Sequence, residues 1–338
     1  MSSGLNTQFW RDRPVAITGA TGFLGYHVAR LLALSGARVR ALVRPTSQIR
    51  RCHGLNLEFH LAPLEDFEAL CRSLRNQDIV FHLAGSVHLG DDWQSVWHTN
   101  VEGTQRLLEA ARQARVRRIV HVSSIVTIGA SRQPRILDES AHWNLGSLKV
   151  PYIQSKREAE TLALLSAARG QDVVIVNPAC LVGPQDYSGS EFGVLCRRFW
   201  CGRIPLMFRG GANFADVRDV AQGILSAAES GRCGQRYILG GVNRTWLDFF
   251  RDLARLSSRP LPRWCAPNSL GPIIATLNRY CERRRRKRPY LSAAQAELLS
   301  WFFFVSSRRA CEELGYYMRP WQHTLRDTYQ FWITSRAA

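Results

Sequence analysis

The stretch VAITGATGFLG, residues 15–25, decides the fold of this chain. A short β-branched run ends in glycines, and a helical pattern over residues 23–34 follows at once. Gly19, Gly22 and Gly25 allow a tight turn, a close approach of the backbone to a pyrophosphate, and close packing of helix on strand. The helix N-terminus offers free N–H groups to such an anion. We therefore predict a dinucleotide-binding loop, with a ligand-free βα turn as the alternative.

Further apolar runs repeat this design at residues 39–43, 78–84, 118–123 and 173–177. The segments between them have helical periodicity, and one face of such a segment is formed by Trp97, Val101, Thr104, Leu108 and Ala111. Continuous apolar strands that alternate with helices indicate a doubly wound parallel sheet covered on both faces. Right-handed crossovers bring the carboxyl ends of the strands, and any ligand, to one edge.

The pattern changes after about residue 180, where glycines and prolines become common and the elements become short. We predict an α/β protein in which a doubly wound Rossmann sheet carries a smaller C-terminal substrate-binding lobe. Residues 1–13 would form an N-terminal extension, residues 14–180 the NAD(P)-binding domain and residues 181–338 the lobe. The chain is expected to cross between the two, with residues 212–245 returning to the Rossmann domain.

Composition narrows the class of protein. The chain has 338 residues, 46% of them hydrophobic, which favours a globular fold. It has no apolar run long enough for a membrane span and no signal-peptide pattern, so we expect a cytoplasmic protein. The nine cysteines include no Cys-x-x-Cys pair, so the sequence predicts neither a disulfide framework nor a metal site.

The net charge of +18 is concentrated in part in the basic run at residues 283–288. A solvated surface is the simplest interpretation. The second is peripheral docking at an anionic membrane surface through residues 268–288, where an apolar stretch precedes the basic run. A nucleic-acid partner ranks last, because aromatic residues are not interleaved with the basic ones.

The segment VRALVRPTSQIRR, residues 39–51, bears on the cofactor. Sites that prefer NAD usually carry an acidic residue here to hold the ribose 2′-OH. Arg44 lies at that position and Arg51 follows, so the segment favours a 2′-phosphate. We predict that NADP (NADPH) is preferred and that NAD is the alternative; arginines that are merely solvated are the other interpretation.

The segments HVSSIVTIG (121–129) and YIQSK (152–156) supply candidate catalytic groups. Tyr152 and Lys156 share a face if their segment is helical, and a nearby ammonium would lower the pKa of the phenol. Such a tyrosine can exchange a proton with a carbonyl or alcohol oxygen. Ser124, after the strand at 118–123, can donate a hydrogen bond to the same oxygen.

These motifs resemble those of an extended short-chain dehydrogenase/reductase of the NAD-dependent epimerase/dehydratase family. The branch they resemble includes dihydroflavonol-4-reductase-like, 3β-hydroxysteroid-dehydrogenase-like and hopanoid-associated epimerase-like proteins. The matching motifs are TGATGFLG (18–25), VRALVRPTS (39–47), NVEGT (100–104), VSS (122–124), LDES (137–140), YIQSK (152–156), NPACLVGP (177–184), FADVRDVA (214–221), YILGG (237–241) and SSRRACEELGY (306–316).

The resemblance implies roles for individual residues. Ser124 matches the family's catalytic serine, Tyr152 its proton donor or acceptor, and Lys156 the group that activates the tyrosine and holds the nicotinamide ribose. Asn100 matches a helix residue that is structural or part of a proton relay. The cofactor-binding residues implied are Gly19, Thr21, Gly22, Phe23, Leu24, Gly25, Arg44, Arg51, Leu64, Ala84, Gly85, Ser86, Asn100, Tyr152, Lys156, Pro178 and Leu181. A homodimer is also implied by resemblance.

The chain departs from the family pattern at Ala62-Pro63-Leu64, where the family often has Gly-Asp-Leu. Leu64 can still pack on the adenine, but the carboxylate that would hold it is missing. Glu65 and Asp66 are the neighbouring candidates to replace that carboxylate.

Three functions remain open. The first is an NADP-preferring oxidoreductase that reduces a ketone, or oxidises a secondary alcohol, on a lipophilic or polycyclic substrate. The second is a nucleotide-sugar epimerase or dehydratase with retained NAD, which the arginines at 44 and 51 disfavour. The third is a non-catalytic NADP-sensing protein, which the retained Tyr152 and Lys156 disfavour. A lipophilic pocket or an ordinary lobe core would equally explain the large apolar residues Phe192, Phe199, Trp200, Leu206, Met207 and Phe208.

Overall fold

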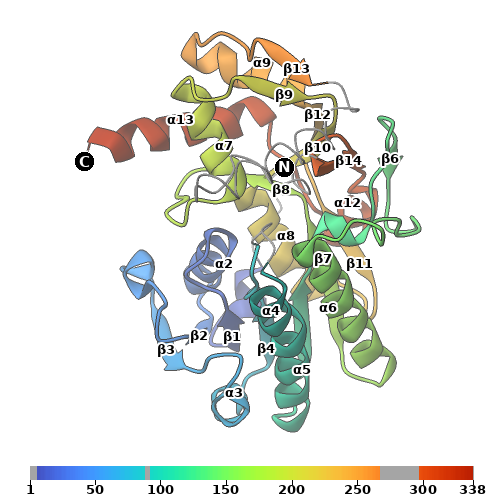
Figure 1. The fold of residues 1–338 in the computed structure, drawn as a ribbon. Helices are drawn as coiled ribbons and strands as arrows, with labels where there is room; N and C mark the ends of the chain where they lie inside the picture. The colour runs from blue at the N-terminus through green and yellow to red at the C-terminus, as the bar shows by residue number, and fades with distance from the viewer. Residues whose placement is uncertain (1–5, 88–91, 267–296, 338) are drawn as a thin grey trace.

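The computed structural model describes residues 6–87, 92–266 and 297–337, and its centre is a seven-stranded parallel sheet (Figure 1). The strand order is β11-β7-β5-β4-β1-β2-β3. This arrangement confirms the predicted doubly wound α/β class. The strands are β1 (Pro14–Thr18), β2 (Arg38–Val43), β3 (Leu57–Leu61), β4 (Ile79–His82), β5 (Arg118–Val122), β7 (Val173–Pro178) and β11 (Arg236–Leu239).

The inner strands are buried on both faces, as their continuous apolar sequences predict. Along β1, Ile17 packs into the core on one face of the sheet, and Ala16 packs into a second core on the other face. Helices α2 (Phe23–Leu34) and α8 (Val217–Ser230) pack against each other on the first face. The second face is covered by α3 (Phe67–Leu74), α5 (Gly103–Gln113) and α6 (Pro151–Ala168).

A second, five-stranded sheet lies beyond the carboxyl edge of the first (Figure 1). Its order is β12-β10-β14-β6, and β8 also pairs with β10. The strands are β6 (Ile136–Leu137), β8 (Cys180–Val182), β10 (Gly211–Asp216), β12 (Val242–Thr245) and β14 (Phe302–Val305). Around it lie the β9–β13 pair (Leu206–Phe208 with Trp264–Ala266) and the helices α7 (Glu191–Trp200), α9 (Trp246–Ser257), α12 (Arg308–Leu314) and α13 (Trp321–Ala337).

The chain passes between the two sheets more than once. It leaves the large sheet after Pro178 and enters the small one at Cys180. It returns for α8 and β11, at residues 217–239, while β10 and β12 on either side belong to the small sheet. The domain boundaries predicted at 13/14 and 180/181 stay predictions.

Aromatic side chains fill the core of the small lobe. Phe214 stacks on Phe249 with ring centroids 4.2 Å apart, and Trp321 lies 5.9 Å from Phe214. Of the large apolar residues singled out in the sequence, Phe199, Trp200 and Phe208 are buried in the core. For these three, the interpretation as ordinary lobe core is the one that the packing supports.

The described part of the N-terminal segment is packed into the large domain. Helix α1 (Thr7–Trp10) places the Trp10 ring, which is fully buried, 6.0 Å from the ring of Phe81 on β4. The Trp10 indole N–H donates to the Glu229 carboxylate on α8.

Among the described residues, no helix combines the length and the apolar character needed to cross a bilayer. The predicted membrane-contacting segment 268–288, with its basic run, lies outside the described residues. Membrane contact and the homodimer both stay predictions.

Candidate functional site

The glycine loop joins β1 to α2 at the carboxyl edge of the large sheet. Gly19 has a φ of +76°, and a Cβ there would lie 2.8 Å from the Ala84 nitrogen. A Cβ on Gly25 would lie 2.0 Å from the Gly19 carbonyl oxygen, so the helix can pack this closely only on glycine. Helix α2 begins after Gly22 without a side-chain cap, which leaves its first N–H groups available to an anion. The loop therefore fits a dinucleotide pyrophosphate.

The arginine segment after β2 folds against this loop. Residues Ile49–Cys52 form a 3₁₀ turn, and the Cys52 thiol lies 3.6 Å from the Ala20 carbonyl oxygen. The Arg51 guanidinium donates to the Thr21 carbonyl at 3.3 Å, while the Arg44 side chain is exposed. The sequence from residue 43 to residue 52 contains no carboxylate. This corner can therefore hold a phosphate on the adenine-side ribose.

The loop after β4 is fixed by Asn100. The Asn100 amide accepts from the Ser86 backbone N–H at 2.7 Å, and donates to the Ser86 carbonyl and to the Ser155 hydroxyl, both at 2.9 Å. These bonds place Ala84, Gly85 and Ser86 over Lys156: a Cβ on Gly85 would lie 3.4 Å from the Lys156 Nζ. Asn100 lies in a π-helical turn, His98–Glu102, between α4 (Trp93–Trp97) and α5. Helical periodicity in the sequence predicted one regular helix here, so this turn was missed.

Ser124 and Tyr152 are brought together. Ser124 begins a short 3₁₀ turn (Ile125–Thr127) directly after β5, and Tyr152 lies in the first turn of α6. Burial of the phenol raises the pKa of Tyr152, and the neighbouring Ser124 side chain opposes this with a smaller lowering effect.

Lys156 is buried one turn further along α6. The Lys156 ammonium donates to the Val122 carbonyl at 3.0 Å, and burial lowers the pKa of the lysine to about 8, against an opposing effect of Glu160. The sequence predicted that Lys156 would lower the pKa of Tyr152, and this was wrong for the present structure. The reason is that the ammonium is held at the end of β5 and desolvation of the phenol dominates.

A buried polar cluster lies behind Ser124, and no motif in the sequence indicates it. The Glu160 side chain is fully buried on α6, and its Oε2 lies 2.6 Å from the Thr127 hydroxyl and accepts from the Asn177 amide at 2.6 Å. The Thr127 hydroxyl also lies 2.7 Å from the Ser124 carbonyl. Arg236, on β11, donates to Glu160 Oε1 at 3.3 Å. The cluster fixes the backbone that carries Ser124.

A second buried cluster ties the glycine loop to α5. The His82 ring on β4 lies 2.9 Å from the Thr18 hydroxyl and 3.0 Å from the Thr104 hydroxyl. The Ala84 N–H donates to Thr18 at 3.1 Å. Burial, with a smaller effect of Lys156, lowers the pKa of His82 to about 3, so this histidine is neutral.

The remaining predicted cofactor residues lie on the same edge. Pro178 ends β7 and Leu181 lies in β8, where the chain passes to the small sheet. Leu64 packs at the start of α5, where a Cβ on Gly103 would lie 2.8 Å from its Cδ1. Asp66, one of the residues expected to replace the missing carboxylate, instead caps α3 by accepting from the Ala69 N–H at 2.8 Å.

Comparison with known proteins agrees with this geometry. Residues 15–240 match the model of the NAD dependent epimerase/dehydratase family. Over 304 residues the chain is 34% identical to Sterol demethylase protein B of Methylococcus capsulatus, covering 88% of this chain and 92% of that protein. It is 32% identical to a putative dihydroflavonol 4-reductase of Synechocystis, covering 88% of each.

Among solved structures, PA4631, a nucleoside-diphosphate-sugar epimerase from Pseudomonas aeruginosa, superposes with a TM-score of 0.80 and 28% identity. The match covers 96% of this chain and 98% of that one. The chain therefore belongs to the NAD-dependent epimerase/dehydratase family and is an NAD(P)-dependent oxidoreductase of the extended short-chain dehydrogenase/reductase type that acts on a small-molecule substrate.

Proposed function

We propose that this enzyme prefers NADP and reduces a ketone, or oxidises the corresponding secondary alcohol, on a lipophilic or polycyclic substrate. The observation that carries the cofactor preference is the contact between Arg51 and the glycine loop at the Thr21 carbonyl. It holds a guanidinium at the corner where NAD-preferring sites carry an acid. Arg44, exposed at the end of β2, adds a second cation there.

Tyr152, Ser124 and Lys156 have different roles at the substrate and the cofactor. When bound, the reduced nicotinamide would supply the hydride. Tyr152, whose raised pKa keeps it protonated, donates the proton to the substrate oxygen in the direction of reduction. Ser124 donates a hydrogen bond to the same oxygen, because its hydroxyl already lies against the Tyr152 phenol. Lys156, held at the Val122 carbonyl, is placed to hold the ribose.

The substrate class is supported by the names of two relatives and by apolar residues of the lobe. One relative is named for sterol demethylation and another for dihydroflavonol reduction, and both names refer to polycyclic molecules. In this chain, Phe192, Leu206 and Met207 remain partly buried at the border of the lobe core.

A nucleotide-sugar epimerase with retained NAD is the second candidate, and the likeness to the Pseudomonas epimerase favours it. A non-catalytic NADP-sensing protein is the third, and the retention of both Tyr152 and Lys156 argues against it.

The first experiment is a titration of the purified protein with NADPH, NADH, NADP and NAD, followed by nicotinamide fluorescence. The protein is also denatured and examined for nucleotide that it already holds. Tight, exchangeable NADPH binding with weak NADH binding is the expected result, and screening of ketones follows from it. Retained NAD with little response to NADPH would overturn the proposal in favour of the epimerase.

A further inference from the structure

His82 ends strand β4 at the carboxyl edge of the large sheet, and the residue is only 1% exposed. Its ring uses both nitrogens. Nδ1 lies 2.9 Å from the hydroxyl of Thr18 at the end of β1, and Nε2 lies 3.0 Å from the hydroxyl of Thr104 on α5. Both threonines are buried as well. The ring therefore joins two segments that are far apart in the sequence.

The partners of the two hydroxyl groups fix the direction of every bond in this chain. The Thr104 hydroxyl donates its single proton to the Asn100 carbonyl at 2.6 Å, so toward His82 it can only accept. The neutral ring must therefore carry its proton on Nε2, which leaves Nδ1 as an acceptor. Thr18 already accepts from the Ala84 N–H at 3.1 Å, and it donates its own proton to Nδ1.

Both ends of the chain reach backbone at the candidate cofactor site. One end is the Ala84 N–H itself. The other end is Asn100, whose side-chain amide accepts from the Ser86 N–H at 2.7 Å and donates to the Ser86 carbonyl at 2.9 Å. The loop of residues 84–86 is thus held at its first and last members, and His82 connects the two groups that hold it.

This loop lies between two parts of the site. A Cβ on Gly19 would lie 2.8 Å from the Ala84 nitrogen, and a Cβ on Gly85 would lie 3.4 Å from the Lys156 Nζ. A shift of residues 84–86 would therefore change the space beside both groups. Ordering a loop at the moment of binding costs conformational entropy, and a loop that the protein already holds avoids that cost.

We propose that His82 is a positioning residue for the dinucleotide, which acts by holding residues 84–86 in the conformation that the cofactor needs. The inference rests on the proposed place of the cofactor at this edge. It adds a determinant of affinity that does not depend on the 2′-phosphate. Loss of the chain should therefore weaken the binding of NADPH and of NADH by the same factor, unlike the loss of Arg51.

The position of the ring proton is the first test. A ¹H–¹⁵N spectrum of the labelled full-length enzyme, tuned to the imidazole nitrogens, distinguishes the two tautomers, and the His82 signal is identified by its loss in His82→Gln. We expect a neutral ring with its proton on Nε2 between about pH 6 and 8. A proton on Nδ1, or a ring that titrates in this range, contradicts the direction of the chain and overturns the proposal.

The second test is nucleotide binding, followed by nicotinamide fluorescence. Thr104→Val removes the acceptor of the His82 N–H with little change of shape. The dissociation constants of NADPH and NADH should each rise about tenfold, the order that loss of one buried hydrogen bond gives. Thr104→Ser keeps the hydroxyl and should bind as the wild type does. The double variant Thr18→Val/Thr104→Val should bind as Thr18→Val alone does, because both changes break one chain.

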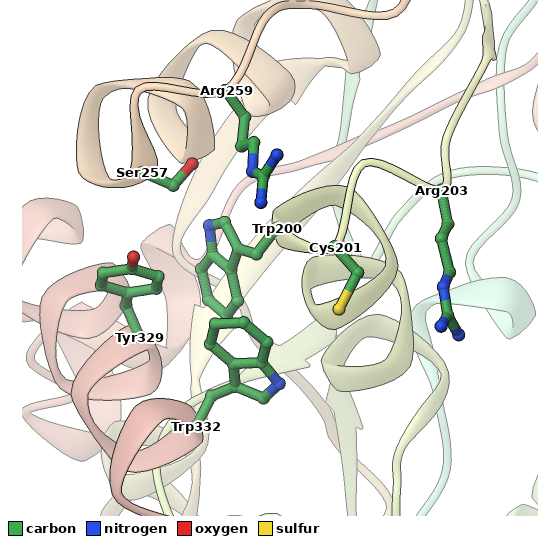
Figure 2. A pocket seen from close by; sticks show the side chains of 7 residues that line it. All are labelled: Trp200, Cys201, Arg203, Ser257, Arg259, Tyr329 and Trp332. Atoms are coloured by element: carbon green, nitrogen blue, oxygen red, sulfur yellow. The ribbon is translucent and has the colours of Figure 1, made fainter. Parts of the chain in front are cut away.

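Thr328→Val is the matched control. The Thr328 hydroxyl is buried on α13 and donates to the Thr324 carbonyl, four residues earlier, at 2.6 Å, which is the bond that Thr104 makes on α5. Figure 2 shows its neighbour Tyr329 on α13 beside Trp332 and Trp200 of the small lobe. Thr328→Val should bind both nucleotides as the wild type does, whatever stability it loses.

Three results of the titrations would overturn the proposal. They are binding by Thr104→Val that is as tight as that of Thr328→Val, binding by Thr104→Ser that is as weak as that of Thr104→Val, and additive losses in the double variant. A wild-type protein that binds neither nucleotide would overturn the proposed function itself, and this inference with it.

Discussion

Replacing Glu160 by glutamine should destabilise this enzyme strongly although no substrate atom is touched. The Glu160 side chain is fully buried, and its two oxygens meet Thr127, Asn177 and Arg236 at 2.6, 2.6 and 3.3 Å. Glutamine has nearly the same shape but turns one acceptor into a donor. That donor must then face either the Arg236 guanidinium, which can only donate, or the Thr127 and Asn177 side chains, which would have to give up their present hydrogen bonds to the carboxylate.

The cost follows from these contacts. The change removes the charged partner of Arg236 from a buried ion pair, and such changes cost about 3–5 kcal/mol. The matched control is Glu158→Gln, the same change on a partly exposed residue of the same helix, which should stay within about 0.5 kcal/mol of the wild type.

Urea unfolding followed by circular dichroism measures both free energies of unfolding. Turnover should fall as well in Glu160→Gln, because the cluster fixes the Ser124 carbonyl. If Glu160→Gln loses no more stability than Glu158→Gln, the reasoning from this cluster is wrong.

Three further predictions concern the cofactor edge. Tyr152→Phe should lower turnover by about 10²–10⁴-fold while the NADPH dissociation constant stays the same; a turnover near wild type would remove the tyrosine from the proton transfer. Arg51→Gln should raise the dissociation constant for NADPH about tenfold and leave that for NADH nearly unchanged, which competitive titrations measure. An equal rise in the dissociation constants of NADPH and NADH would show that Arg51 stabilises the glycine loop and does not bind the 2′-phosphate. The third prediction concerns Lys156, whose pKa falls from 10.5 to about 8 on burial. Between pH 8 and 10.5 the unfolded chain therefore binds more protons than the folded protein, and the free energy of unfolding rises with pH in that range. From pH 7.5 to 9.5 the free energy of unfolding of the wild type should rise by about 2 kcal/mol relative to that of Lys156→Met, as measured by urea unfolding at both pH values. If the two free energies change with pH in the same way, Lys156 is not a buried group that titrates in this range.

The sequence predicted the parts of the fold that repeat a local pattern. Strands β1, β4, β5 and β7 are largely apolar runs because both faces are covered, β2 keeps enough apolar residues to be recognised although it carries Arg40, and the glycine loop has its own spacing. Strand β3 was missed because it lies at the sheet edge and its residues are largely exposed, so its sequence, LEFHL, alternates with polar residues. The short β11 was known only as a motif, YILGG, and its place beside β7 depends on the long return of the chain.

The candidate site was predictable to a similar extent. Ser124 and Tyr152 were expected to lie close together, and the Ser124 side chain is near enough to the phenol to lower its pKa. The pKa of Tyr152 could not be predicted, because it depends on how deeply the phenol is buried and on where the Lys156 ammonium is directed. The pairing of Asn177 with Glu160 joins a strand end to a helix, and nothing in the spacing of the two residues indicates it.

The order of strands in the small sheet has a consequence for the growing chain on the ribosome. Strand β14 lies between β10 and β6 and pairs with both, yet it is made of residues 302–305 of 338. The large sheet has all its strands once β11 ends at Leu239, whereas β6 has no strand neighbour in the described chain until β14 emerges. A nascent or prematurely terminated chain that stops before residue 302 therefore carries a complete nucleotide-binding sheet beside an open edge. Quality-control proteases and chaperones would therefore recognise the small lobe, whose strand edge is still unpaired, and not the large one.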